Sequence, residues 1–406
     1  MNLPSHGPDL PASRVVAQSA AALVVGIGIG RFAFTPILPL MIDQAGLTPR
    51  GGAAIAATNY AGYFVGALLG IALPRLVRFK AGFRWALVVQ IASLAAMPLA
   101  HSVGWWSALR CASGIASAAI FMTGAASLLA HLHGRRAHLA GWGYAGVGAG
   151  IVASGLAVAL LQQVTDWAVC WEVAALLAAL AAWACWTMRL ELHHAAVPDR
   201  ASTSAPPRRG ASRAFVSLAV AYSLEGAGYV IAGTFLVAAI DENSPGWVGS
   251  SAWVIAGLAA VPSCAAWTWL ARRFAIPTLL AAALAVQAFG IALPAVFDGP
   301  VAAVGSALLF GATFMGAVAL TMAAGRALAF PRAVAILTAG YALGQIVGPA
   351  LVGALAEAGY RPALSLGGGI VLVGAFAATL GRVLSTRPGQ SAPVDALMEE
   401  VEAPRG

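Results

Sequence analysis

The sequence predicts an all-α integral membrane protein with twelve transmembrane helices in two pseudo-symmetric bundles of six. Three observations predict this fold class. The 406 residues are 60% hydrophobic and only 9% charged, with a mean hydropathy of +0.83, whereas a soluble domain carries about 25% charged residues. Apolar residues gather in twelve segments, each near the roughly 20 residues that a spanning helix needs. The two halves of the chain also repeat.

The apolar segments and the polar stretches between them divide the chain. We expect a short N-terminal segment (1–14), a first bundle (15–188), a polar linker (189–212), a second bundle (213–385) and a tail (386–406). Continuous hydropathy favours helices, because barrel strands would alternate polar and apolar residues. The expected spans are 15–42, 52–74, 84–101, 105–130, 138–161, 167–188, 213–240, 247–271, 276–297, 300–325, 332–356 and 362–385.

Lysine and arginine residues predict the orientation of these spans. Nineteen of the 23 lie in the termini, the linker and the loops on one side, whereas the opposite loops hold only Arg50 and Arg361. Arg31 and Arg110 lie within spans. Basic residues gather on the cytoplasmic side of membrane proteins. Both termini should therefore be cytoplasmic, in a bacterial-type inner membrane. The net charge of +8 is then a topology signal and indicates no nucleic-acid partner.

The internal repeat aligns span 1 with span 7 and span 5 with span 11. Two halves of six spans begin on the same side of the membrane, so the repeat is parallel, about an axis along the membrane normal. The aligned positions include Gly28 with Gly226, Gly30 with Gly228, Arg31 with Tyr229, and Gly143-Tyr144-Ala145 with Gly340-Tyr341-Ala342.

Four motifs in this frame match a known family. The loop after span 2, from Gly70 to Arg78, keeps Gly70, Arg75 and Arg78 of a G-x-L-x-D-R-x-G-R signature, with Pro74 and Val77 in place of its Asp and second Gly. The others are Arg110-x-x-x-Gly114 in span 4, the glycine-rich spans 5 and 11, and the pair of Gly-Ile-Gly-Arg-Phe (28–32) and Glu225-Gly-x-Gly-Tyr229. Over about residues 15–385 the chain resembles the major facilitator superfamily, and within it the YbfB/YjiJ group. The resemblance implies a transporter whose spans 1, 4 and 7 line a central cavity.

Three charged residues lie well inside spans: Arg31, Arg110 and Glu225. A charge at membrane depth is expensive and is a candidate for function. Arg31 is expected to bind a substrate carboxylate or phosphate, since its fork matches those groups; the alternative is a structural pair with Glu225 or with backbone carbonyls. Arg110 is expected to bind substrate in the same way or to influence a nearby acid; the alternative is a structural arginine of span 4, close to the outer end and only partly buried. Glu225 is a candidate proton carrier, because burial and a nearby arginine would act on its charge in opposite directions; the alternative is a static salt bridge.

Neutral polar side chains in the spans are candidates for orienting a substrate. Such groups give a pocket its specificity, and hydrogen bonding between helices is the alternative role. The predicted substrate-binding set comprises Arg31, Arg110, Tyr229, Gln345, Asn59, Tyr63, Tyr144 and Tyr341.

Small residues and prolines in spans 5 and 11 predict the moving parts. Glycines at helical spacing allow helices to approach and slide, and proline bends a helix. We assign gating to Gly146, Gly150, Gly344, Gly348 and Pro349, and we expect Pro36 and Pro39 to bend span 1.

Together these features predict a secondary active transporter that moves a small organic solute, foremost an organic anion, by alternating access coupled to protons. The alternatives are a proton-driven efflux pump for lipophilic or cationic compounds and, more remotely, a membrane sensor without transport. We expect a monomer in the lipid bilayer, with no cofactor, no metal site and no enzymatic activity. The sequence contains no nucleophile–base or phosphate-loop motif.

Overall fold

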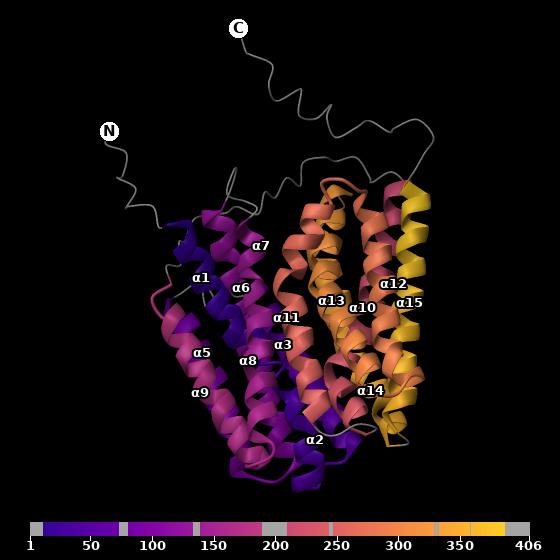
Figure 1. Ribbon diagram of the computed structural model, residues 1–406. Coiled ribbons are helices and arrows are strands. Elements are labelled where there is room, and N and C mark those ends of the chain that lie inside the picture. The colour runs from indigo at the N-terminus through magenta and orange to yellow at the C-terminus, as the bar shows by residue number, and fades with distance from the viewer. Residues whose placement is uncertain are drawn as a thin grey trace, which may run out of the picture.

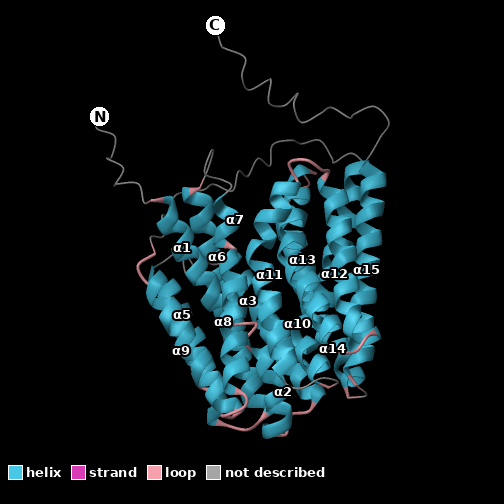
Figure 2. Cartoon of the chain, viewed as in Figure 1, coloured by secondary structure: helices cyan, strands magenta, loops and turns pink. Residues whose placement is uncertain are grey.

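The computed structural model describes residues 11–72, 80–132, 139–188, 209–242, 247–328, 330, 333–357 and 359–385. Within these residues every regular element is a helix (Figure 2). Twelve helices are long and apolar enough to cross a membrane, which confirms the predicted fold class. Most of the loop motif (73–78 of 70–78), most of the predicted linker (189–208) and the predicted tail (386–406) lie outside the described residues.

The N-terminal half contains spans 1 to 6. Span 1 consists of α1 (Ala12–Leu23), the π-helix η1 (Val24–Ile29) and α2 (Phe34–Ala45). The remaining elements are α3 (Pro49–Ala72), α5 (Lys80–Ala95) with the short 3₁₀ turn η2 (Met97–Leu99), α6 (Val103–His131), α7 (Ala140–Gly143) with α8 (Ala145–Leu161), and α9 (Trp167–Cys185).

The C-terminal half contains spans 7 to 12, each a single helix. Span 7 begins inside the predicted linker, at Arg209. The elements are α10 (Arg209–Asp241), α11 (Trp247–Leu270), α12 (Ile276–Val296), α13 (Pro300–Ala327), α14 (Ala333–Ala356) and α15 (Tyr360–Ser385). The two halves stand side by side and their helices run in the same general direction (Figure 1).

The repeat predicted from the sequence reappears in the packing. Gly114 of α6 crosses α3 against the backbone of Asn59, and Gly311 of α13 crosses α11 against the backbone of Ala256. The numbering shift that takes Gly114 to Gly311 also takes Asn59 to Ala256. The same close crossing, which leaves no room for a Cβ, is therefore built twice.

The described parts of the two halves meet mainly through α8 with α11, α3 with α14, and α2 with α10, and α11 also contacts α7 and α2. Between α8 and α11 the contact is backbone to backbone, since a Cβ on Gly148 would lie 2.6 Å from the carbonyl oxygen of Gly257. Between α2 and α10 the Thr35 hydroxyl donates to the carbonyl oxygen of Gly233. Span 1 therefore meets span 7 through α2, at the end far from the N-terminus (Figure 1).

Candidate functional site

The middle of span 1 departs from regular helical bonding. Just after η1, two hydrogen bonds reach five residues back into it, from Gly30 N–H to Val25 O (3.0 Å) and from Phe32 N–H to Ile27 O (3.3 Å). Pro36 follows and has no N–H for the Phe32 carbonyl, so the Thr35 N–H donates there instead (3.3 Å). The carbonyl of Arg31, which Thr35 would serve in a continuous helix, therefore needs another donor. The expected bend is thus a break at 30–33, just before Pro36.

Arg110 of α6 supplies that donor. Its Nη1 donates to Gly30 O at 2.6 Å and its Nη2 to Arg31 O at 2.9 Å. The side chain is 2% exposed and lies between the rings of Phe34 and Trp171, each 5.7 Å from its Cζ. At membrane depth, backbone carbonyls left without donors are costly. Arg110 therefore stabilises the break in span 1.

Glycine at position 30 lets polar groups from two other spans reach the same break. A Cβ there would lie 2.7 Å from the Nε2 of Gln90. Gln90, on α5, donates to Ser113 at 2.8 Å, and Ser113 in turn donates to Gly30 O at 3.2 Å. Gln90 was not among the residues predicted from the sequence, although a glutamine in an apolar span is a detectable signal.

Arg31 has a different environment from Arg110, although both are buried. Its Cζ lies 4.2 Å from the centre of the Tyr63 ring and 4.8 Å from that of Tyr60, both on α3. The hydroxyls of Tyr229 and Tyr341, from the other half, are within electrostatic reach. The side chain is 7% exposed, yet its Nε and Nη2 have no hydrogen-bond partner within the described part of the chain.

Two side chains of the C-terminal half complete the surroundings of Arg31. Gln345 of α14 donates through Nε2 to the Tyr229 hydroxyl of α10 at 2.5 Å, and its Oε1 is buried without a partner among the described residues. The ring of Tyr229 is nearly parallel to those of Tyr341 and Phe314, at centroid distances of 5.6 and 6.2 Å. Tyr229 is thus the residue that connects the two sets of unpaired atoms, because it accepts a hydrogen bond from Gln345 and lies within electrostatic reach of Arg31.

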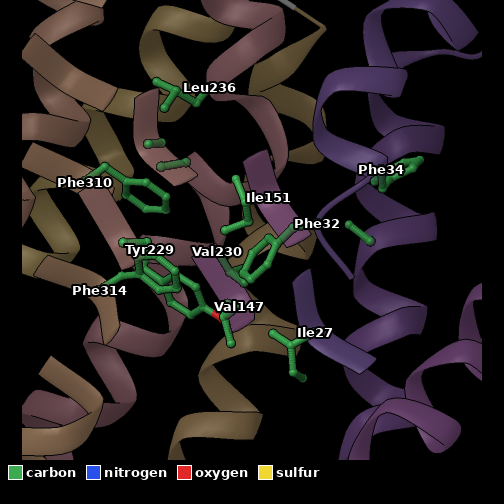
Figure 3. Packing of buried hydrophobic residues seen from close by; sticks show 14 of the residues in the cluster. Ile27, Phe32, Phe34, Val147, Ile151, Tyr229, Val230, Leu236, Phe310 and Phe314 are labelled. Atoms are coloured by element: carbon green, nitrogen blue, oxygen red, sulfur yellow. The ribbon is translucent and has the colours of Figure 1, made fainter. Parts of the chain in front are cut away.

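Phe32 links this cluster to the rest of the interface between the halves. Its ring meets Trp253 of α11 and Phe314 of α13 edge-on, at centroid distances of 6.0 and 5.9 Å. Figure 3 shows Phe32 pointing toward Tyr229 and Phe314, while Phe34 lies on the other side of span 1. The break turns successive side chains of span 1 in different directions, so that Arg31 and Phe32 both reach the boundary.

Glu225, on α10, lies apart from both arginines. It is fully buried, its Oε1 accepts a hydrogen bond from Nε2 of Gln287 (3.1 Å) on α12, and its Oε2 has no partner among the described residues. The other titratable groups near it are the hydroxyls of Tyr222, Tyr229 and Tyr341. No ion pair joins Glu225 to Arg31 in the described structure, so the alternative of a salt bridge between them finds no support.

The structure places the predicted substrate-binding set in two groups. Arg31, Tyr63, Tyr229, Tyr341 and Gln345 lie together at the interface between the halves, with Tyr144 joined to Tyr63 through Phe121 at centroid distances of 6.3 and 6.4 Å. The second group is structural in its contacts. Arg110 binds the backbone of span 1, and Asn59 donates through Nδ2 to the Arg110 carbonyl at 2.8 Å.

The predicted gating glycines pack against spans 1 and 7 of their own halves. Gly146 lies against the backbone of Ala20, and a Cβ on Gly150 would be 2.6 Å from the Cα of Gly28. In the other half, Gly344 and Gly348 lie against the backbone of Ala227. The glycines therefore bring α8 and α14, which both lie at the interface between the halves, close to the helices that carry Arg31 and Tyr229. Helix α14 runs through Pro349.

Comparison with known proteins agrees with this architecture. A family described as "Uncharacterised MFS-type transporter YbfB" matches residues 23–379. Among solved structures, a crystal structure of a mutant of the nucleoside transporter NupG is similar, with a TM-score of 0.68 and 14% sequence identity over 90% of this chain and 99% of that one. Among curated proteins, no sequence matches the chain. With the family match covering most of the twelve spans, the chain belongs to the YbfB family of the major facilitator superfamily and is a secondary transporter.

Proposed function

We propose that this transporter carries a small organic anion and that Arg31 binds the carboxylate or phosphate of that anion. The observation that supports the proposal is the unpaired edge of the Arg31 guanidinium. Nε and Nη2 lie on the same side of the group, and both are buried without a partner in the described residues. Two parallel N–H donors on one edge match the two oxygens of a carboxylate or phosphate. Leaving a buried donor unpaired costs about 1–3 kcal/mol, so a ligand that pairs both stabilises the site.

The rings around Arg31 favour an anion that also has a flat, apolar part. Tyr63 and Tyr60 cover Arg31 from the N-terminal half. From the other half, Tyr229 and Tyr341, whose rings are nearly parallel to each other, lie within electrostatic reach of Arg31. Aromatic side chains bind planar groups by stacking and by edge contacts. Gln345 offers Oε1 as an acceptor for a hydroxyl or amine of the substrate. The residues that approach the ligand come from both halves, as alternating access requires.

Proton coupling through Glu225 is the second part of the proposal. A carboxylate at membrane depth without a cation beside it is costly to keep charged, and Oε2 of Glu225 is unpaired among the described residues. Glu225 and Tyr229 are separated by one turn of α10, so a change in the substrate site reaches the carboxyl through a single helix. Gln287 holds the other oxygen. We propose that Glu225 takes up and releases the coupled proton as the halves move.

The proposed setting is a bacterial-type inner membrane, with both termini in the cytoplasm and the chain acting as a monomer. The distribution of basic residues supports this orientation. On that orientation, the contact between α2 and α10 lies on the outer side.

A thermal-shift screen of the purified protein in detergent tests the anion site. The ligands are organic carboxylates, phosphate esters, sugars, amino acids, uncharged nucleosides and lipophilic cations, each at pH about 5.5 and 7.5. A ligand raises the unfolding midpoint only if it binds the folded state. We expect a carboxylate or phosphate ester to stabilise the wild type and to lose this effect in Arg31→Gln. Arg31→Lys replaces the planar guanidinium, with its two parallel donors, by a single ammonium group. The loss of one charge-assisted hydrogen bond should weaken binding roughly 10- to 150-fold.

The exposed Arg50 provides the matched control. Arg50→Gln removes the same charge from the chain and should leave every shift unchanged. A carboxylate shift that persists in Arg31→Gln would refute the assignment of Arg31. Stabilisation by lipophilic cations alone would favour the efflux alternative, with Glu225 as the partner of the cation. Equal stabilisation of wild type and Arg31→Gln by an uncharged nucleoside would indicate that the site recognises rings and not charge.

A further inference from the structure

A cavity lies away from the interface between the halves, where the start of α5 meets the end of α9. Its volume is about 350 Å³, and it is lined by Lys80, Ala81, Arg84, Trp85, Val88 and Trp186. Two of these side chains are cationic and none is acidic. The proposed substrate site includes none of them.

The geometry of Arg84 orients one cation at this cavity. Its Nε donates to the carbonyl oxygen of Trp186 at 3.3 Å, and its Cζ lies 4.9 Å from the centre of the Trp186 ring. Lys80 is four residues earlier on α5, so both side chains lie on the same face of the helix. The cavity therefore presents two positive charges together, with the guanidinium held against the end of α9.

The order of side chains along α5 matches the layers of a membrane interface. Lys80 begins the helix, Arg84 and Trp85 follow one turn later, and Val88 lies one further turn toward the membrane interior. Trp85 is 67% exposed and Val88 is 40% exposed. Basic residues and tryptophan are enriched at headgroup depth, and apolar residues face the acyl chains. The cavity thus passes from charged to apolar over about 12 Å of helix.

We propose that this cavity binds an anionic phospholipid of the cytoplasmic leaflet. Lys80 and Arg84 would hold the headgroup phosphate, Trp85 and Trp186 would border the glycerol region, and Val88 would contact an acyl chain. Basic pockets between helices on the cytoplasmic side have the chemistry that such headgroups require. The side of the membrane follows from the distribution of basic residues. The proposal does not depend on the substrate site.

The site belongs to the N-terminal half alone. The numbering shift that takes Gln90 to Gln287 takes Lys80 to Pro277, Arg84 to Ala281, Trp85 to Ala282 and Trp186 to Val383. The two halves therefore share the buried glutamine, but only the N-terminal half has the cations and the tryptophans at these positions. This asymmetry provides a control, because the C-terminal half has a different basic pair, Arg272 and Arg273, with Arg273 4.8 Å from the ring centre of Trp269.

The experiment compares lipid binding by the full chain with that of two double variants. Lys80→Gln/Arg84→Gln removes the cations of the cavity, and Arg272→Gln/Arg273→Gln removes two exposed cations elsewhere. Each protein, delipidated in detergent, is titrated with phosphatidylglycerol, with phosphatidylcholine of the same acyl chains, or with glycerol phosphate. The readouts are the unfolding midpoint and the number of lipids retained in native mass spectrometry.

We expect phosphatidylglycerol to raise the midpoint of the wild type and of Arg272→Gln/Arg273→Gln, with one tightly retained lipid. In Lys80→Gln/Arg84→Gln, binding should weaken roughly 30-fold, as expected for two lost surface charges. An equal loss in both double variants would show that net charge and not the cavity attracts the lipid, and would overturn the proposal. Equal stabilisation by phosphatidylcholine or by glycerol phosphate would also overturn it, the latter by identifying a soluble phosphate ester as the ligand. The unliganded midpoints of the variants establish that they are folded.

Discussion

The crossing of span 1 and span 5 at Gly28 and Gly150 should not tolerate a single added methyl group. A Cβ on Gly28 would lie 2.6 Å from the Cα of Gly150 and 2.8 Å from the carbonyl oxygen of Val147. Ordinary contacts of a Cβ begin near 3.4 Å. Both neighbours are backbone atoms, so no change of rotamer relieves the clash, and η1 and α8 must separate by roughly 1 Å. Overpacking of this kind costs about 1–3 kcal/mol.

The higher helix propensity of alanine opposes this overpacking cost but is smaller, so the substitution should be destabilising. Alanine is favoured over glycine in a regular helix by about 0.5–1 kcal/mol. We therefore expect Gly28→Ala to lower the stability of the folded protein and to weaken binding at Arg31, three residues further along the same break. Gly369→Ala is the matched control, because no atom lies within 4 Å of its Cβ position on α15. That substitution should be neutral or stabilising.

The measurement is the unfolding midpoint in detergent, followed by fluorescence-detected size exclusion, for wild type, Gly28→Ala, Gly150→Ala and Gly369→Ala. Because Gly28 and Gly150 meet at one crossing, we expect the double variant Gly28→Ala/Gly150→Ala to deviate from the sum of the two single variants. A midpoint of Gly28→Ala at or above that of Gly369→Ala would refute the reasoning.

Two further predictions concern the charged residues. Arg110→Met removes the charge-assisted bonds to Gly30 O and Arg31 O, although Ser113 still donates to Gly30 O. Stability should fall by about 2–4 kcal/mol, Arg110→Lys should recover part of the loss because it reaches one carbonyl, and an unchanged midpoint in Arg110→Met would contradict a structural role. Glu225→Gln should abolish accumulation driven by a pH gradient and keep counterflow exchange in proteoliposomes; accumulation equal to wild type would remove Glu225 from the coupling proposal.

The architecture could be predicted from the sequence because membrane burial leaves a strong signal. Twelve apolar segments near the required length are sufficient for the spans, and the aligned glycines indicate the repeat. Helix ends were less predictable: α10 begins at Arg209, within the predicted linker, because polar composition does not stop a helix from continuing past the membrane surface. The break in span 1 was expected only as a bend near Pro36. Its actual form depends on Arg110 and Ser113, which are 79 to 83 residues away in the sequence from the carbonyls that they bind.

The site was only partly predictable for a related reason. The sequence indicates which residues are charged at membrane depth, and their partners depend on packing. Gln287, which holds Glu225, and Phe32 and Phe314, which join the halves, were missed. Glutamine in an apolar span is a usable signal, and its recurrence at Gln90 and Gln287 in the repeat strengthens it. Buried phenylalanines give no comparable signal, because most of them form core contacts.

Packing gives different roles to the two arginines that are buried in the described interior. A helix that breaks at membrane depth needs donors for its exposed carbonyls. Arg110 meets that need for Gly30 and Arg31, and it does so from a neighbouring helix, so the Arg31 side chain is not consumed by its own backbone. Glu225 is held by Gln287 and does not neutralise Arg31. We therefore propose that a ligand neutralises the charge at the interface between the halves, and this is the physical basis for expecting an anion there.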